Sequence, residues 1–132
     1  MNTSTRFLMK TLLVAFALVL TASTVSAQDV AKVAPDNCKL LLENDRVRVV
    51  EIWIKPGEKL RLHSHPPSVT YVLTAGKLKT TLPDGKTVET EAQMGQTLWN
   101  DGGSHEQVNV GTTEVRALVV EMKMPATTPE KK

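Results

Sequence analysis

The chain contains only three histidines, and their spacing is the first indication of chemistry. His63 and His65 flank Ser64 in a segment where apolar and polar residues alternate. Because side chains alternate between the two faces of a strand, both imidazoles are expected to project from the same face. Two such imidazoles form half of a divalent metal site, and His105, which follows a Gly-Gly turn, could supply a third nitrogen. The alternative for an isolated His-x-His pattern is a pair of exposed histidines on an edge strand.

Five further residues are candidates for the wall of a substrate pocket, because they share a strand face with a histidine or carry an aromatic ring: Arg61, Tyr71, Trp99, Gln107 and Asn109. Arg61 could bind a substrate carboxylate through its planar guanidinium, although an exposed strand position explains it equally well. The two aromatic residues are expected in the core or in the pocket wall. No general base is recognisable, so the catalytic residues and the reaction stay undefined.

The elements that must position these residues are strands. Segments rich in β-branched residues or with alternating polarity are separated by turn residues such as Pro56-Gly57 and Pro83-Asp84-Gly85. The expected strands are 46–54, 59–65, 68–73, 77–82, 86–91, 96–100, 105–110 and 115–122. Short strands at regular spacing, with no sustained helical period after residue 40, predict an all-β sandwich or barrel.

The spacing of glycines and histidines resembles the two motifs of the cupin family. The residues that carry the resemblance are Gly57, His63-Ser-His65 and Gly76 for the first motif, and Gly95, Asp101-Gly-Gly-Ser-His105 and Asn109 for the second. The resemblance extends over residues 43–123 and implies a jelly-roll β-barrel whose interior holds a metal, usually on three histidines and one glutamate. It implies His63, His65 and His105 as ligands of a divalent transition metal such as iron, manganese, zinc or nickel.

The chain departs from the cupin pattern at the glutamate ligand. This residue should fall at Val69 or Thr70, or at Ser68 in another register, and none of the three is acidic. A site of three histidines leaves positions open for water, substrate or oxygen. Without a charged ligand, however, it should hold metal less tightly than a site with a carboxylate.

Two functions from different classes follow from these residues. The first is a metal-dependent enzyme acting on a small organic substrate, either a dioxygenase-like oxidoreductase or an isomerase or decarboxylase. The second is a non-catalytic module that binds a small ligand without metal. The three histidines favour the first and the missing glutamate favours the second. The resemblance to cupins also implies a homodimer.

Residues 1–27 have the layout of a secretory signal peptide. A positive segment ends at Lys10, an apolar run follows, and small residues lead to Ala27. The apolar run has about ten residues, whereas a membrane-spanning helix needs roughly 20. The sequence therefore predicts cleavage between Ala27 and Gln28 and a secreted or periplasmic protein that no longer contacts the membrane. The lone Cys38 is then buried, free or paired with another chain.

The chain is long enough for one domain, and its charges are nearly balanced. The chain has 132 residues, with 16 Lys and Arg against 14 Asp and Glu. Arg6 and Lys10 in the predicted signal peptide account for that excess, so charge does not indicate a nucleic-acid partner. A small molecule is the expected partner. The expected organisation is a signal peptide (1–27), an N-terminal arm (28–42), a β-barrel (43–124) and a disordered tail (125–132).

Overall fold

The computed structural model describes residues 28–124. The predicted signal peptide and the predicted tail lie outside the described residues, so both remain predictions. Within residues 28–124, no helix is long and apolar enough to cross a membrane.

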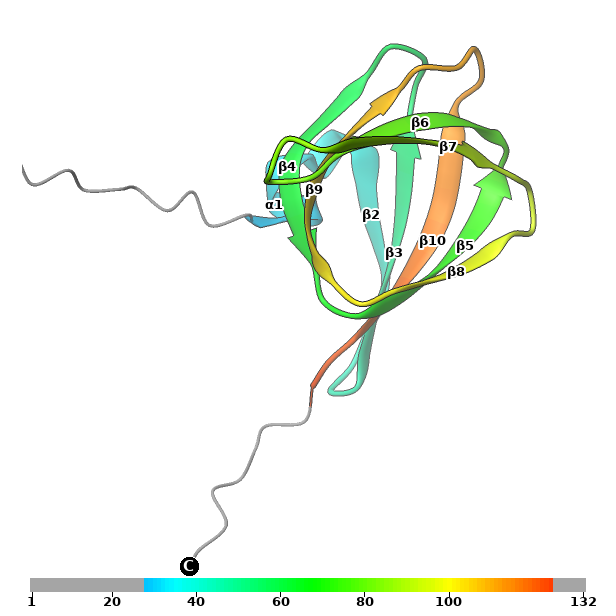
Figure 1. Ribbon diagram of the computed structural model, residues 1–132. Coiled ribbons are helices and arrows are strands. Elements are labelled where there is room, and N and C mark those ends of the chain that lie inside the picture. Colours follow the sequence, from blue (N-terminus) through cyan, green and yellow to red (C-terminus); the bar gives the residue numbers. More distant parts are fainter. Residues whose placement is uncertain (1–27, 125–132) are drawn as a thin grey trace, which may run out of the picture.

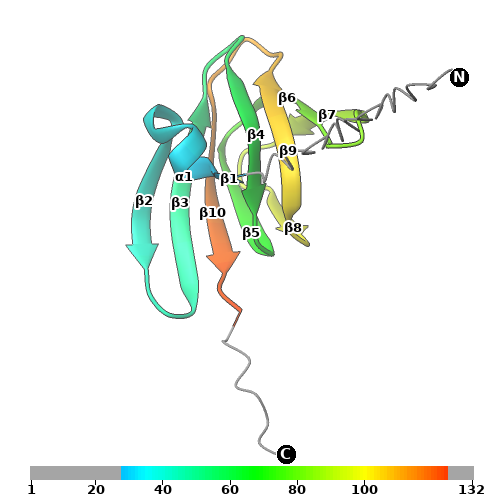
Figure 2. The same ribbon diagram turned by 90° about the vertical axis from the view of Figure 1, so that its left-hand side faces the viewer.

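Two five-stranded sheets face each other and enclose a barrel (Figure 1). The first sheet has the order β1 (Gln28–Asp29), β4 (Lys59–His65), β9 (Gly103–Asn109), β6 (Gly76–Thr81) and β7 (Thr87–Ala92). The second has the order β2 (Cys38–Glu43), β3 (Val47–Ile54), β10 (Val115–Met122), β5 (Ser68–Thr74) and β8 (Thr97–Asn100). Figure 2 shows the two layers from the side. This architecture confirms the expected all-β jelly-roll barrel.

The alternation that predicted the strands is visible in their burial. In β3, the side chains of Val50, Ile52 and Ile54 are buried, whereas the intervening Glu51 and Trp53 are only half-buried. Residues i and i+2 share one face of a strand, so the apolar set of β3 turns towards the barrel interior. Each predicted strand from residue 46 onward is present, with its ends within a few residues of the expected bounds.

Residues 28–42 differ from the expected arm, because they contribute to both sheets. β1 pairs in parallel with β4, and β2 pairs with β3. Between them lie the short helix α1 (Val30–Val33) and the 3-10 turn η1 (Pro35–Asn37). The pairing of β2 with β3 slips between Leu40 and Leu42, which breaks the alternation by which a strand is recognised in the sequence.

The apolar core joins this N-terminal segment to both sheets. Val30 of α1 is fully buried in a cluster with Val50 and Leu60, among others. Each fully buried aliphatic side chain of this kind stabilises the fold by about 1.5–3 kcal/mol. Cys38 packs against the same cluster as a free thiol, and burial raises its pKa to about 11.

Candidate metal centre

A bulge in β4 turns the first two histidines towards the interior. Leu60 pairs with Gln107 and His63 pairs with His105, so two residues of β4 stand opposite one residue of β9. The extra residue moves Arg61 to the exposed surface, although simple alternation predicted that it would share the face of His63. Arg61 therefore does not line the cavity, and that expectation is corrected.

A close approach of two chain segments places His105 beside the other histidines. Gly102, in the turn before β9, has a φ of +92°, and a Cβ atom there would lie 3.0 to 3.1 Å from backbone atoms of His65, Pro66 and Pro67. A side chain would force these segments apart, so the turn requires glycine. With glycine there, His105 of β9 pairs directly with His63 of β4.

The three imidazoles form one compact cluster. One nitrogen from each of His63, His65 and His105 lies within 4.8 Å of the others, which brings all three within reach of one ion. The ring centroid of His63 lies 5.0 Å from that of His65 and 4.6 Å from that of His105. Among the described residues, the Nε2 atoms of His63 and His105 are buried without a hydrogen-bond partner. Buried polar atoms normally have a partner, so these two nitrogens fit the ligand set of a metal.

Hydrogen bonds fix which nitrogen two of the imidazoles, those of His63 and His65, present to the cluster. The Nδ1 atom of His63 lies 2.7 Å from the carbonyl oxygen of Arg61, which can only accept, so Nδ1–H donates and Nε2 keeps its lone pair. The Nδ1 atom of His65 lies 2.7 Å from Oε1 of Glu121 and donates in the same way. A metal-binding histidine usually donates its second nitrogen to a carbonyl or a carboxylate, so both contacts suit a metal site.

Burial favours the neutral, metal-binding form of His63 and His105. Desolvation, the largest effect, lowers the pKa of His63, and desolvation followed by the neighbouring imidazoles lowers the pKa of His105 to about 3. The ordinary value for histidine is about 6.5. Protons therefore compete with a metal for these nitrogens only at a lower pH than in an exposed site.

A chain of charged groups lies behind His65. Glu121 is 2% exposed, and its second oxygen, Oε2, lies 3.3 Å from Nη1 of Arg48. Arg48 in turn forms a two-point ion pair with Asp29, whose hydrogen bonds lower the pKa of Asp29 and raise that of Arg48. Two carboxylates and one guanidinium leave one net negative charge next to the histidines. The negative charge therefore lies beside the histidine cluster, whereas the three candidate metal ligands themselves include no acidic residue.

The candidate residues found in the sequence did not include these charged groups, Glu121, Arg48 and Asp29, although the sequence holds a signal for two of them. Arg48 shares the parity of the buried Val50 on β3, and Glu121 shares that of the buried Val119 on β10. Arg48 and Glu121 are also register partners in the sheet. Opposite charges at inward positions of two apolar strands indicate a buried ion pair, once the pairing of the strands is known.

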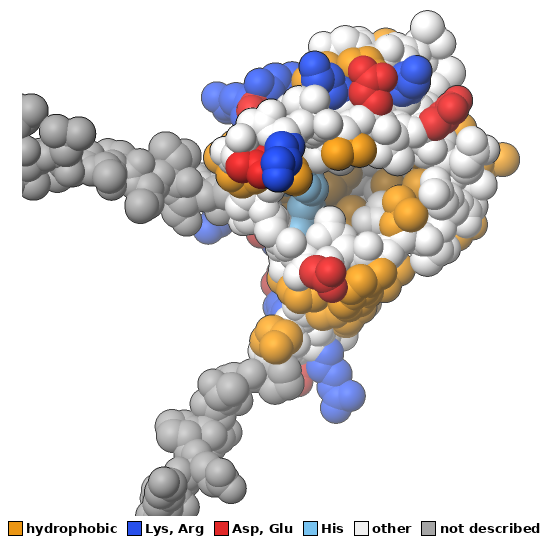
Figure 3. All heavy atoms as spheres, viewed as in Figure 1, with side chains coloured by type: hydrophobic (Ala, Val, Ile, Leu, Met, Phe, Trp, Pro, Cys, Tyr) orange, Lys and Arg blue, Asp and Glu red, His pale blue; other side chains and the backbone are white. Residues whose placement is uncertain are grey.

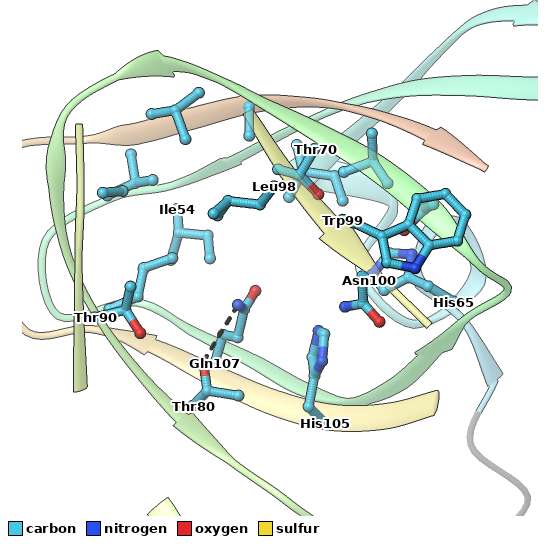
Figure 4. A pocket seen from close by; sticks show the side chains of 18 residues that line it. Ile54, His65, Thr70, Thr80, Thr90, Leu98, Trp99, Asn100, His105 and Gln107 are labelled. Atoms are coloured by element: carbon cyan, nitrogen blue, oxygen red, sulfur yellow. Dashed lines mark hydrogen bonds between the residues drawn. The ribbon is translucent and has the colours of Figure 1, made fainter. Parts of the chain in front are cut away.

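The cluster opens into a cavity of about 390 Å³. Figure 3 shows the hollow at the open end of the barrel, with histidine on its wall. His65 and His105 line it, and His63 is fully buried. The expected wall residues Trp99 and Gln107 line it as well (Figure 4).

Two other expected wall residues lie elsewhere. Tyr71 is 44% exposed and is not part of the cavity wall. Asn109 is fully buried, and its amide donates to the carbonyl oxygens of Ile54 and Thr113, 2.7 Å each, while its oxygen accepts from the backbone of Gly111. Asn109 therefore holds the turn between β9 and β10. Ser68 and Thr70, two of the positions at which the cupin pattern could place its glutamate, do line the cavity.

Comparison with known proteins supports the fold. No protein-family model and no curated sequence matches the chain. Among solved structures, a cupin domain from Bordetella pertussis is similar, with 27% identity and a TM-score of 0.61 over 66% of this chain and 92% of that one. A double-stranded β-helix protein from Klebsiella pneumoniae has 20% identity and a TM-score of 0.54 over 64% and 74%. The polyketide cyclase RemF from Streptomyces resistomycificus has 26% identity and a TM-score of 0.50 over 66% and 64%.

These features define a class of protein: a double-stranded β-helix barrel with a cluster of three histidines facing a cavity. The chain is a cupin-superfamily domain, as the motif spacing indicated.

Proposed function

We propose that this protein binds one divalent transition metal through His63, His65 and His105 and acts on a small organic molecule held in the cavity. The observation that carries the proposal is the pair of buried, unpartnered Nε2 atoms of His63 and His105, next to the oriented imidazole of His65. RemF, one of the similar structures, is a polyketide cyclase, which supports an enzyme on this fold.

The residues around the cavity would have the following roles in such a reaction. A bound metal would act as a Lewis acid on an oxygen atom of the substrate. Glu121 fixes the orientation of His65 through its hydrogen bond to Nδ1. Apolar side chains line much of the cavity, which lowers the local dielectric constant and strengthens polar interactions there. Gln107 supplies an amide that can donate to or accept from the substrate.

A non-catalytic ligand-binding module is the second candidate. The observation that favours it is the chemistry of the cavity wall: among the described residues that line it, the histidines are the only titratable acids or bases. Conversion of a ligand by the metal-loaded protein, followed by mass spectrometry, distinguishes the two functions, because a binding module returns the ligand unchanged.

Metal analysis tests the proposed site. The protein, purified without a histidine tag, is expected to bind one equivalent of zinc, manganese, iron or nickel. His63→Ala, His65→Ala and His105→Ala should each lower the bound metal sharply, because every histidine of the chain belongs to the site. The matched control is Glu106→Gln, since Glu106 neighbours His105 but pairs with Lys59 on the outer surface. Less than about a tenth of an equivalent, with no uptake of added metal, would refute the metal site.

We also propose that the protein is exported and processed after Ala27. The support is the three-part layout of residues 1–27. N-terminal sequencing of exported material should begin at Gln28, and an intact Met1 in the membrane fraction would contradict the proposal.

A further inference from the structure

In the described part of the chain, the wall of the cavity carries no formal charge outside the histidine cluster. Of the residues within 28–124 that line it, none is Lys, Arg, Asp or Glu. The charged candidate, Arg61, lies on the outer surface, and the charges of Glu121 and Arg48 are paired behind His65. A ligand that enters the cavity therefore meets no counter-charge from residues 28–124 beyond the histidine end.

The cavity has one strongly apolar wall. Ile52 and Ile54 of β3 and Val115, Ala117 and Val119 of β10 line it from the second sheet. Figure 4 shows Ile54 and Leu98 on the side of the cavity that faces away from His105 and Gln107. Burying apolar ligand surface against such a wall contributes about 25 cal/mol for each Å² removed from water.

Uncharged polar groups line the cavity from both sheets, with Gln107, Thr80 and Thr90 on the first and Ser68, Thr70 and Asn100 on the second. Gln107 lies two residues after His105 on β9, and its Nε2 reaches Oγ1 of Thr80 at 3.4 Å. This long contact leaves the amide capacity to bind a ligand oxygen. At the rim, Trp99 is 60% exposed and offers an aromatic surface to a ring that enters.

We infer that the cavity accepts an uncharged, largely apolar, ring-bearing molecule whose single oxygen group faces the histidines. The cavity volume of about 390 Å³ is in the range of small-molecule sites. A carboxylate or phosphate at the far end would be buried without a partner, which is costly. The inference deepens the proposed function, since it names the substrate class of the same site.

A matched ligand pair tests the inference. The probes are 2-naphthol and 6-hydroxy-2-naphthoate, which share the ring and the hydroxyl group and differ by one carboxylate. Calorimetric titration of the full chain should show binding of 2-naphthol and at least tenfold weaker binding of the carboxylate. Equal or tighter binding of the carboxylate, or no binding of 2-naphthol, would overturn the inference.

A pair of substitutions shows whether the wall itself discriminates. Thr80→Lys places a cation on the inner face of β6 and should reverse the preference towards the carboxylate by at least tenfold. Thr81→Lys is the matched control, because Thr81 pairs with the outward Glu106 and does not line the cavity. It adds the same charge and should leave the preference unchanged. Equal effects of the two substitutions would contradict a role of the cavity wall.

Failure of the inference can be separated from failure of the proposed function. Metal uptake is measured first, without any organic probe, and its absence refutes the metal site alone. The apolar wall does not depend on the metal, so the two probes are compared on chelator-treated protein as well. A preference for 2-naphthol there supports the inference even if no metal binds.

Discussion

Glu121 reaches the histidine cluster from behind. Its Oε1 atom binds Nδ1 of His65, so the carboxylate orients the ring and adds negative charge without occupying a ligand position. Carboxylates that orient a ligating histidine in this way typically raise metal affinity 10- to 100-fold. Glu121 therefore supplies part of the negative charge that a ligand glutamate would provide, although it contacts His65 and not the metal position.

Glu121→Gln is therefore expected to weaken metal binding by roughly 10- to 100-fold while the barrel still folds. The amide oxygen can still accept from Nδ1, but the negative charge is lost and Arg48 loses one of its two ion-pair partners among the described residues, keeping Asp29. Competition with a chromogenic chelator measures the affinity. Glu51→Gln is the matched control, because Glu51 pairs with Arg116 away from the histidines. Equal metal affinities of the two variants would show that Glu121 does not tune the site.

At the level of single residues, the sequence predicted the cluster of three histidines better than it predicted the cavity wall. The three histidines could be found because they are the only ones and follow strand parity. Arg61 was misplaced because one bulge in β4 reverses parity, and nothing in the local sequence marks that bulge. Asn109 has the parity of an inward residue, but its side chain serves the backbone of a turn. Such roles depend on strand pairing, which one sequence does not specify.

The turn before β9 decides how closely the two histidine-bearing strands approach. Gly102 and Gly85 both have positive φ values, +92° and +85°, but only Gly102 lies against other backbone atoms. Substituting alanine at each of the two glycines therefore separates the cost of the positive φ from the cost of a clash with neighbouring backbone atoms.

Gly85→Ala should lower the free energy of unfolding by about 1–2 kcal/mol, the cost of the left-handed conformation alone. Gly102→Ala should cost more and should also weaken metal binding, because a Cβ would meet the carbonyl oxygen of His65 at 3.1 Å. Urea denaturation and chelator competition measure the two effects. Equal losses of stability, with unchanged metal affinity for Gly102→Ala, would contradict this account.

The elements themselves were largely predictable. Alternating β-branched segments with glycine and proline turns predicted the strands from β3 to β10. The N-terminal elements were not predictable, because β1 has two residues and α1 has four, too few for any period to show. Their place comes from long-range contacts, such as the burial of Val30 and the ion pair of Asp29 with Arg48.

At the scale of the whole molecule, the barrel makes His63 and His105 harder to protonate than they are in the unfolded chain. The folded protein lowers the pKa of His63, and that of His105 to about 3, whereas both would titrate near 6.5 in the unfolded chain. Below pH 6.5 the unfolded chain therefore binds protons that the folded, metal-free protein does not. By linkage, the free energy of unfolding must fall as the pH falls.

The metal-free protein should accordingly lose stability between pH 7 and pH 5, before the carboxylates titrate. The limiting slope is about 1.4 kcal/mol per pH unit for each of the two histidines, and the loss continues until the pH approaches the folded pKa. Urea denaturation of chelator-treated protein at several pH values measures it. His105→Gln should show a shallower dependence than the wild type, because one proton-binding difference is removed. Parallel curves for the two proteins would mean that burial of His105 does not make the barrel sensitive to acid.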